Sequence, residues 1–373
     1  MKSIKIGAIL LILTASGLYA GDSDDSKRYY EENHAKYEKF LENGNVYEKL
    51  EAIAWMSSLR KYRFIRPLSR ELLHGMEDPT QRKMAAFDPY IKSQIAIAIG
   101  EVDRKEGLAS LTKALEFSNA ILEEQRKAFE AKANKAAEEK SFELPVPANK
   151  YGPALMKEGY LFPVSPDAYW SIANDFKALD YDQNDEQSRI RMEGYNYVNV
   201  LYHVLVAISK IGDEKSLDLV TPFLDHPYSD VRLGAVVATT QLGSDKARDI
   251  LLEKYAKETD DVVKARMASG ILLLDTRKSE IYSDLVEKYL RHDNVKVRFE
   301  AARGLENLAL GESLFHLHDA FLLETNQQVK NMLIQAIHNA NADNILPPNP
   351  IYDTGPTKIW VYGEPVQPRE SGR

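Results

Sequence analysis

One short acidic segment carries oxygen-bearing side chains at the spacing that calcium loops use. Asp180, Asp182 and Asn184 alternate along the chain, as the first ligands of such a loop do. The rest of the loop requires a glycine at its sharp turn and a closing glutamate, but Asp185 and Arg191 stand at those positions. The segment is therefore a weak calcium candidate, with a solvated acidic turn as the competing interpretation. We expect no other metal site and no cofactor.

The sequence lacks the residue patterns of the common catalytic sites. It contains no Gly-x-Ser-x-Gly, no His-Glu-x-x-His, no phosphate-binding glycine loop and no cysteine. His316 and His318 are two positions apart, so on a helix they point in different directions and cannot share a metal. We therefore predict no catalytic residues and a protein that is not an enzyme.

Aromatic side chains are concentrated between residues 151 and 181, where prolines interrupt regular helix. Tyrosine and tryptophan are frequent anchors at interfaces, so this segment is a candidate for binding a partner. Its candidate contacts are Tyr160, Phe162, Tyr169 and Trp170. The same side chains would also suit stacking on sugars or packing of the segment on the rest of the protein, and all three interpretations stay open.

The elements that must position these residues are helices, because an apolar pattern returns at a nearly constant interval in the second half of the chain. Val198, Val231, Val263, Val297 and Val329 follow one another at steps of 33, 32, 34 and 32 residues. Seven positions after the last four stands a very small residue, namely Ala238, Gly270, Gly304 and Ala336. Units of this kind bury their apolar faces against their neighbours, so the pattern predicts an all-α solenoid of antiparallel helix pairs.

The repeats resemble the HEAT and HEAT-like family. The residues that carry the resemblance are Asp230-Val231-Arg232 with Ala235 and Leu242, and Val297-Arg298 with Ala301, Ala302 and Leu305. The resemblance is clearest over residues 191–342, and a weaker copy covers residues 46–118. It implies an α-solenoid of antiparallel helix pairs.

A long helix and the aromatic segment interrupt the repeats between residues 119 and 190. Leucines at 108, 115 and 122 and the absence of proline predict one helix of about 35 residues, about 50 Å long. Its narrow apolar stripe suits either packing on the solenoid or docking of another chain. The predicted order is a signal peptide (1–20), a helical lead-in (21–45), repeats (46–118), the insertion (119–190), repeats (191–342) and an extended tail (343–373).

The N-terminus has the pattern of a secretory signal peptide. Lys2 and Lys5 precede an apolar run from Ile6 to Leu13, and cleavage fits after Ala20 or after Gly17. The run is too short to span a bilayer. We therefore expect an exported, soluble and most simply periplasmic protein, with no transmembrane segment in the mature chain. The net charge of −8 argues against a nucleic-acid partner.

Polar and basic residues recur on the same helices as the valines. The basic set comprises Arg232, Lys264, Arg298 and Lys330, which we expect to pair with acids such as Asp230 and Asp261 and so to hold the repeats in register. A second set is expected to be exposed on the concave surface and to contact a protein partner, and it comprises Asn199, His203, Thr239, Arg303, Asn307 and His338.

The tail after Pro347 has a different composition. Residues 358–362 have the alternation of a short strand and include Trp360 and Tyr362, two further partner-binding candidates. The tail either caps the final repeat or remains free to dock elsewhere. Taken together, these patterns favour a non-enzymatic periplasmic scaffold that binds a protein partner, for example in an envelope or periplasmic flagellar assembly. The alternative is a glycan- or peptidoglycan-binding protein that uses the aromatic insertion.

Overall fold

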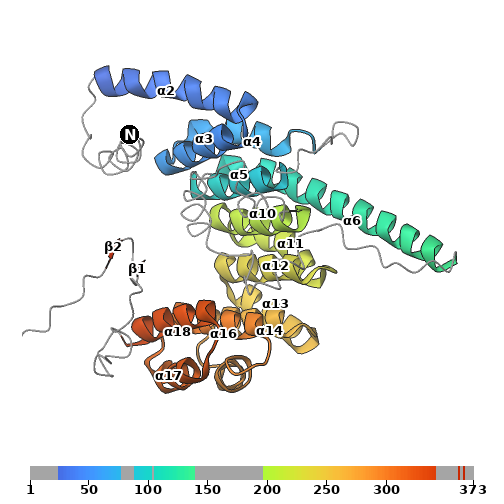
Figure 1. Cartoon of the computed structure of the whole chain (residues 1–373), viewed down its shortest axis with the longest axis vertical. Coiled ribbons are helices and arrows are strands. Elements are labelled where there is room, and N and C mark those ends of the chain that lie inside the picture. The colour runs from blue at the N-terminus through green and yellow to red at the C-terminus, as the bar shows by residue number, and fades with distance from the viewer. Residues whose placement is uncertain are drawn as a thin grey trace, which may run out of the picture. The chain divides into compact units, whose positions relative to one another are not determined.

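The structure is a computed structural model that describes residues 24–76, 88–102, 105–138, 196–341, 360–361 and 364–365. Almost all of these residues are helical (Figure 1). The exception is a two-stranded antiparallel pair, β1 (Trp360–Val361) with β2 (Glu364–Pro365), in which Trp360 lies opposite Pro365. The chain divides into two compact units, residues 1–126 with 167–207 and residues 127–166 with 208–373.

The described part of the first unit is built from helices. They are α2 (Asp24–Asn43), α3 (Val46–Leu59), η1 (Tyr62–Phe64), α4 (Ile65–Leu73), α5 (Asp88–Val102), η2 (Lys105–Gly107), the first part of α6 (Leu108–Glu138) and most of α10 (Tyr197–Ile211). α6 is one helix of 31 residues, close in length to the single long helix that the sequence predicts. α3 begins with a capping box, in which Asn45 accepts from the Glu48 backbone N–H and the Glu48 carboxylate accepts from that of Asn45.

A buried lysine ties α5 to the end of α4. The Lys92 side chain is only 2 % exposed, and its Nζ donates to the carbonyl oxygens of Leu72 at 2.8 Å and His74 at 2.7 Å. The last carbonyl groups of a helix have no hydrogen-bond donor within that helix, so the ammonium group supplies a donor that the helix lacks. Burial lowers the pKa of Lys92, and the nearby Asp88 carboxylate opposes that shift.

We expect Lys92→Met to lower the free energy of unfolding by about 3 kcal/mol, because the substitution keeps the aliphatic length but leaves buried carbonyls without a donor. The measurement is urea unfolding followed by circular dichroism. The matched control is Lys39→Met at an exposed position, where a change within about 0.5 kcal/mol is expected. Equal effects of the two substitutions would show that the carbonyls do not depend on Lys92.

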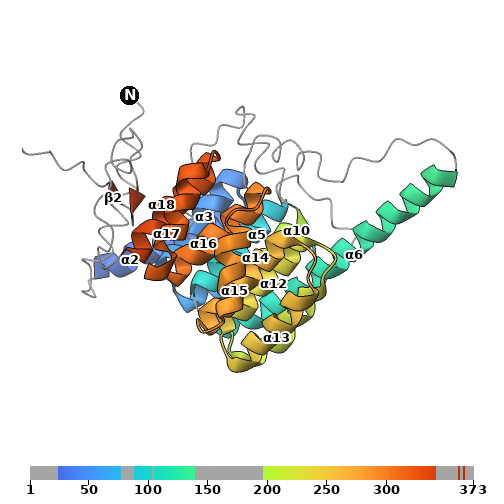
Figure 2. The ribbon, with the colours of Figure 1, turned by 90° about the horizontal axis from the view of Figure 1, so that it is seen from below.

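The described part of the second unit is a two-layer stack of helices (Figure 1 and Figure 2). One layer contains α12 (Ser229–Leu242), α14 (Asp261–Leu274), α16 (Val295–Leu308) and α18 (Gln327–Ala340), each in contact with the next. The other layer contains η4 (Glu214–Ser216), α11 (Leu217–Val220), η5 (Thr221–Asp225), α13 (Asp245–Lys257), α15 (Ser279–Ser283), the π-helical turn η6 (Asp284–Tyr289), η7 (Gly311–Ser313) and α17 (Leu314–Leu323). The predicted all-α solenoid of helix pairs is confirmed.

The recurring valines and small residues form the core of this stack. Val231, Val263, Val297 and Val329 are fully buried. The small residues allow neighbouring helices to approach closely, since a Cβ at Gly304 would lie 2.6 Å from the Cβ of Ser269 on α14. At Gly270 a Cβ would lie 2.3 Å from Oγ1 of Thr240 on α12. The interval at which the valines recur in the sequence is therefore the interval at which successive helices of this layer pack on one another.

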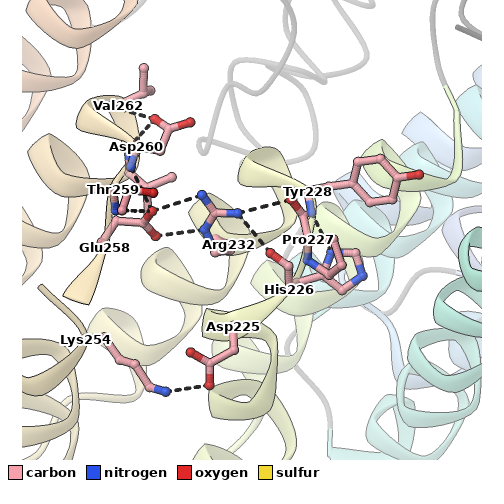
Figure 3. A network of polar contacts seen from close by, with 11 residues as sticks. Asp225, His226, Pro227, Tyr228, Arg232, Lys254, Glu258, Thr259, Asp260 and Val262 are labelled. Atoms are coloured by element: carbon pink, nitrogen blue, oxygen red, sulfur yellow. Dashed lines mark hydrogen bonds and ion pairs between the residues drawn. The ribbon is translucent and has the colours of Figure 1, made fainter. Parts of the chain in front are cut away.

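Two arginines of the basic set join successive helices through glutamates. Arg232 donates from Nε and Nη2 to the two carboxylate oxygens of Glu258, at 2.8 and 3.0 Å, and from Nη1 to the His226 carbonyl at 2.9 Å (Figure 3). Arg298 repeats this arrangement with Glu324, at 2.7 and 2.9 Å, and with the His292 carbonyl at 2.7 Å.

The prediction that acids such as Asp230 and Asp261 pair with the arginines was therefore wrong. Asp230 is two positions from Arg232 on the same helix, where side chains do not face each other. Asp261 lies instead 3.8 Å from Lys288 Nζ and 3.4 Å from His292 Nε2. The arginine side chain reaches the end of the following helix, and that is where Glu258 stands.

Each of these glutamates also caps the turn that follows it. Glu258 Oε1 accepts from the backbone N–H groups of Thr259 and Asp260, both at 2.9 Å. Asp260 in turn accepts from Val262 N–H at 2.9 Å and begins α14 (Figure 3). Burial raises the pKa of Glu258, but Arg232 and the two backbone donors outweigh it and hold that pKa below its ordinary value.

The lysines of the basic set behave differently. Lys264 Nζ lies 5.9 Å from the centre of the Tyr255 ring, and Lys330 Nζ lies 5.9 Å from that of Phe321. Tyr255 and Phe321 precede their lysines by the same number of residues. Successive helices of this layer therefore carry arginine and lysine in turn at the same position. The pattern of contacts made by these basic residues thus repeats every two helix pairs.

Candidate functional site

A basic run distinguishes the first unit from the rest of an acidic chain. Residues 60–70 contain five basic side chains and no acidic one, namely Arg60, Lys61, Arg63, Arg66 and Arg70. They lie at the end of α3, in η1 and along α4. The outer two are paired with acids, since Arg60 lies 3.3 Å from Glu101 and Arg70 contacts Glu38 and Glu42.

The middle of this run borders a cleft of about 610 Å³ between η1, α4 and the first turns of η2 and α6. Its lining is mainly apolar and contains Tyr62, Ile65, Leu73 and Ala109. A hydrogen bond of 2.8 Å between Ser69 Oγ and Ser110 Oγ joins α4 to α6 at the cleft. Both walls of the cleft are therefore helices that this contact and the packing of the core hold together.

The charged residues of the lining are three cations and one acid. The cations are Arg63, Arg66 and Lys113, and the acid is Glu106. Arg66 and Lys113 are exposed, and neither forms an ion pair within the part of the chain that the structure describes. Tyr62, at the same cleft, is 70 % exposed. We call these lining residues the basic cleft. Guanidinium and ammonium groups beside apolar surface suit a ligand that carries both carboxylates and an apolar side chain.

The sequence analysis missed this cleft, although a signal was present. The run 60–70 is short, but its charge is opposite in sign to that of the chain as a whole. The run does not predict the contributions of Glu106 and Lys113, because these residues lie in η2 and α6 and meet the run only in the folded unit.

A second exposed surface lies on α17 in the second unit. Phe315, Leu322 and Leu323 are 69 %, 56 % and 77 % exposed, whereas Leu314 and Leu317 on the opposite side are fully buried. Phe315 and Leu322 are seven positions apart, so they lie on the same side of the helix. We call Phe315, Leu322 and Leu323 the apolar face of α17.

Most of the predicted partner contacts on the inner helices are buried, so the expectation that they are exposed was wrong. The buried members are Asn199, His203, Thr239 and Arg303. Helices that are flanked within a layer leave only a narrow strip for solvent, and Arg303 instead lies 3.4 Å from Glu300. Burial lowers the pKa of His203 to about 3, so its imidazole is neutral at neutral pH. Asn307 and His338 are exposed, and partner binding by them stays a prediction.

Several other predicted residues lie outside the described part of the chain. These are the signal-like residues 1–20, the calcium candidates Asp180, Asp182 and Asn184, and the aromatic candidates Tyr160, Phe162, Tyr169, Trp170 and Tyr362. Trp360 belongs to β1. Within the residues that the structure describes, no group of three or more His, Asp or Glu side chains could hold a metal ion. No helix among them has the length and apolar character needed to cross a membrane.

Comparison with known proteins agrees with the repeat pattern. Residues 196–272, which run from the start of α10 into α14, match the family model of HEAT repeats. The resemblance inferred from the valine and arginine spacing is confirmed over this range. Residues 196–272 are thus similar to HEAT repeats, and the described helices form an all-α solenoid.

Two further similarities are more limited. A leucyl aminopeptidase of Saccharolobus solfataricus is 33 % identical over 114 residues, which are 30 % of this chain and 14 % of that enzyme. The chain thus spans about a seventh of the length of the curated relative that it matches. The crystal structure of an engineered protein is similar at 16 % identity over 82 % of this chain and 87 % of that one, with a TM-score of 0.24.

Proposed function

We propose that this protein is a non-enzymatic periplasmic scaffold that binds an acidic segment of a partner protein in the basic cleft. HEAT repeats support a role in protein interaction. The N-terminal pattern of lysines and an apolar run supports export. The observation that carries the proposal is the pair of exposed cations, Arg66 and Lys113, beside the exposed ring of Tyr62.

The charge of the cleft selects the kind of partner. A chain with net charge −8 repels acidic proteins in general, so a local excess of cations directs an acidic segment to this place. Arg66 can hold a carboxylate through two parallel hydrogen bonds. Tyr62 and Leu73 offer contact area to an aliphatic or aromatic side chain, and Tyr and Arg are the residues most often responsible for interface affinity. The segment that fits therefore has an apolar side chain flanked by acids.

The test uses the full chain and a short labelled peptide in which glutamates flank Leu-Phe, with binding followed by fluorescence anisotropy. We expect the double variant Arg66→Glu with Lys113→Glu to weaken binding at least about tenfold, which corresponds to about 1.4 kcal/mol. Added salt is expected to weaken binding by the unaltered chain, because the contacts are exposed charges.

The control matches the variant in net charge. Lys39→Glu with Lys215→Glu changes the charge of two exposed lysines by the same amount, and neither lysine lines the cleft. This double variant is expected to leave affinity within about twofold, because exposed charges outside a contact are screened by salt. A peptide with glutamine in place of glutamate tests the need for charge. The proposal is wrong if the two double variants bind the acidic peptide equally, or if the unaltered chain does not bind it.

A further inference from the structure

The apolar face of α17 lies in the last described helix pair. Among the described residues, five large apolar side chains are markedly exposed, and three of them are Phe315, Leu322 and Leu323. The final unit of a repeat stack normally presents a polar outer side, because no further unit covers it. Here α17 packs on α18 through Leu317 and its neighbours and leaves its apolar face uncovered. Something is expected to cover it.

The segment that follows α18 is long enough to do so. Residues 342–373 continue the chain from the C-terminal end of α18, the partner helix of α17. The 17 residues before the apolar run 359–362 can span up to about 56 Å when extended. α17 has ten residues and is only about 15 Å long. The run 359–362 can therefore reach any part of the apolar face.

The chemistry of this segment matches the face. Its run Ile-Trp-Val-Tyr contains the strand β1, in which Trp360 and Val361 are adjacent. Lys358 directly precedes the run. The exposed acid Asp319 lies on α17 between Phe315 and Leu322, and its carboxylate also lies 4.0 Å from Arg291 Nη2. Covalent attachment gives such a segment an effective concentration on the order of millimolar, well above that of a second copy in solution. Attachment therefore favours the chain's own segment over another molecule.

We propose that residues 342–373 fold back and cover the apolar face of α17 with the run 359–362. The contact covers the exposed side of the last described helix pair. It does not depend on the basic cleft, which lies in the other unit and is tested separately.

Cysteine crosslinking tests the contact directly, because the chain has no cysteine of its own. Leu322→Cys with Val361→Cys is expected to form an intramolecular disulfide under mild oxidation at least about tenfold faster than Lys246→Cys with Val361→Cys. Lys246 lies on α13 and is exposed, so the control places an accessible thiol away from α17. Peptide mapping by mass spectrometry distinguishes the products. Disulfides between two chains would assign the face to a second copy and overturn the proposal, as would equal rates for the two pairs.

Removal of the segment provides a second readout. A chain that ends at residue 341 is expected to bind a hydrophobic dye more strongly than the full chain and to self-associate. Both effects are expected to disappear when Phe315, Leu322 and Leu323 are changed to serine in the shortened chain. Because these side chains are already exposed on the helix, the serine variant keeps the fold. Unchanged dye binding and unchanged mass in solution after truncation would contradict the proposal.

Discussion

Replacing Arg298 with alanine is expected to lower the free energy of unfolding of the second unit by about 3 to 5 kcal/mol, the usual result of breaking a buried ion pair from one side. The Glu324 side chain is only 3 % exposed, so without Arg298 its charge stays buried and keeps only the two backbone N–H donors of Thr325 and Asn326. The substitution also removes the donor that reaches the His292 carbonyl at 2.7 Å. The expected loss in the free energy of unfolding is therefore much larger than the stabilisation that an average surface ion pair contributes.

The measurement is urea unfolding followed by far-ultraviolet circular dichroism. Lys246→Ala is the control, because its ion pair with Asp218 joins side chains that are 55 % and 77 % exposed and is expected to contribute less than about 1 kcal/mol. The double substitution Arg298→Met with Glu324→Gln is expected to recover part of the loss, since it removes the buried charge and keeps an acceptor for the turn. Equal destabilisation by Arg298→Ala and Lys246→Ala would refute the account.

Acid provides an independent readout of the same contact. Burial raises the pKa of Glu324, but Arg298 and the backbone N–H groups of residues 325 and 326 outweigh it, and the pKa lies below its ordinary value of 4.5. A carboxylate with a lowered folded-state pKa contributes stability that is fully present above the unfolded-state value and is lost as the pH falls through the folded-state pKa. The unaltered chain is therefore expected to lose stability below about pH 4.5 more steeply than Arg298→Ala.

Replacing Gly304 with valine is expected to destabilise the second unit by about 3 kcal/mol, because it overpacks a helix contact. A Cβ at this position would lie 1.7 Å from Ser269 Oγ and 2.6 Å from Ser269 Cβ. Ser269 Oγ can rotate away about χ1, but Ser269 Cβ is fixed to the backbone and cannot withdraw without moving α14. α14 and α16 must therefore separate. Thermal and urea unfolding measure the effect.

Further substitutions distinguish the effect of overpacking from that of the low helix propensity of valine. Asn307→Val places the same side chain at an exposed position of α16 and is expected to cost no more than about 1 kcal/mol. Gly304→Ala is expected to destabilise less than valine, and adding Ser269→Gly is expected to restore stability because it removes both clashing atoms. If the second substitution gives no recovery, the contact between residues 269 and 304 is not the cause.

The repeat period and the residues at fixed places within it were sufficient to predict the helix stack. Val231, Val263, Val297 and Val329 are buried as the spacing predicts, and Gly270 and Gly304 stand where helices meet. These features are local, since a helical period assigns each residue to a face whatever its neighbours are. The partners of Arg232 and Arg298 were missed. The recurrence of Glu258-Thr259-Asp260 as Glu324-Thr325-Asn326 was a usable signal in the sequence, because it follows the two arginines at a constant distance.

The amino-acid sequence by itself determined the helix pairs, their period, the valine core and the residues small enough for close packing, because each of these follows from spacing along one chain segment. The tertiary structure alone decided which polar residues reach solvent and which acids pair with the arginines. Asn199 and Arg303 are buried and the cleft contains Lys113 because helices distant in sequence cover or complete those positions. Burial and pairing depend on the neighbouring helix, and a helical period carries no information about that neighbour's side chains.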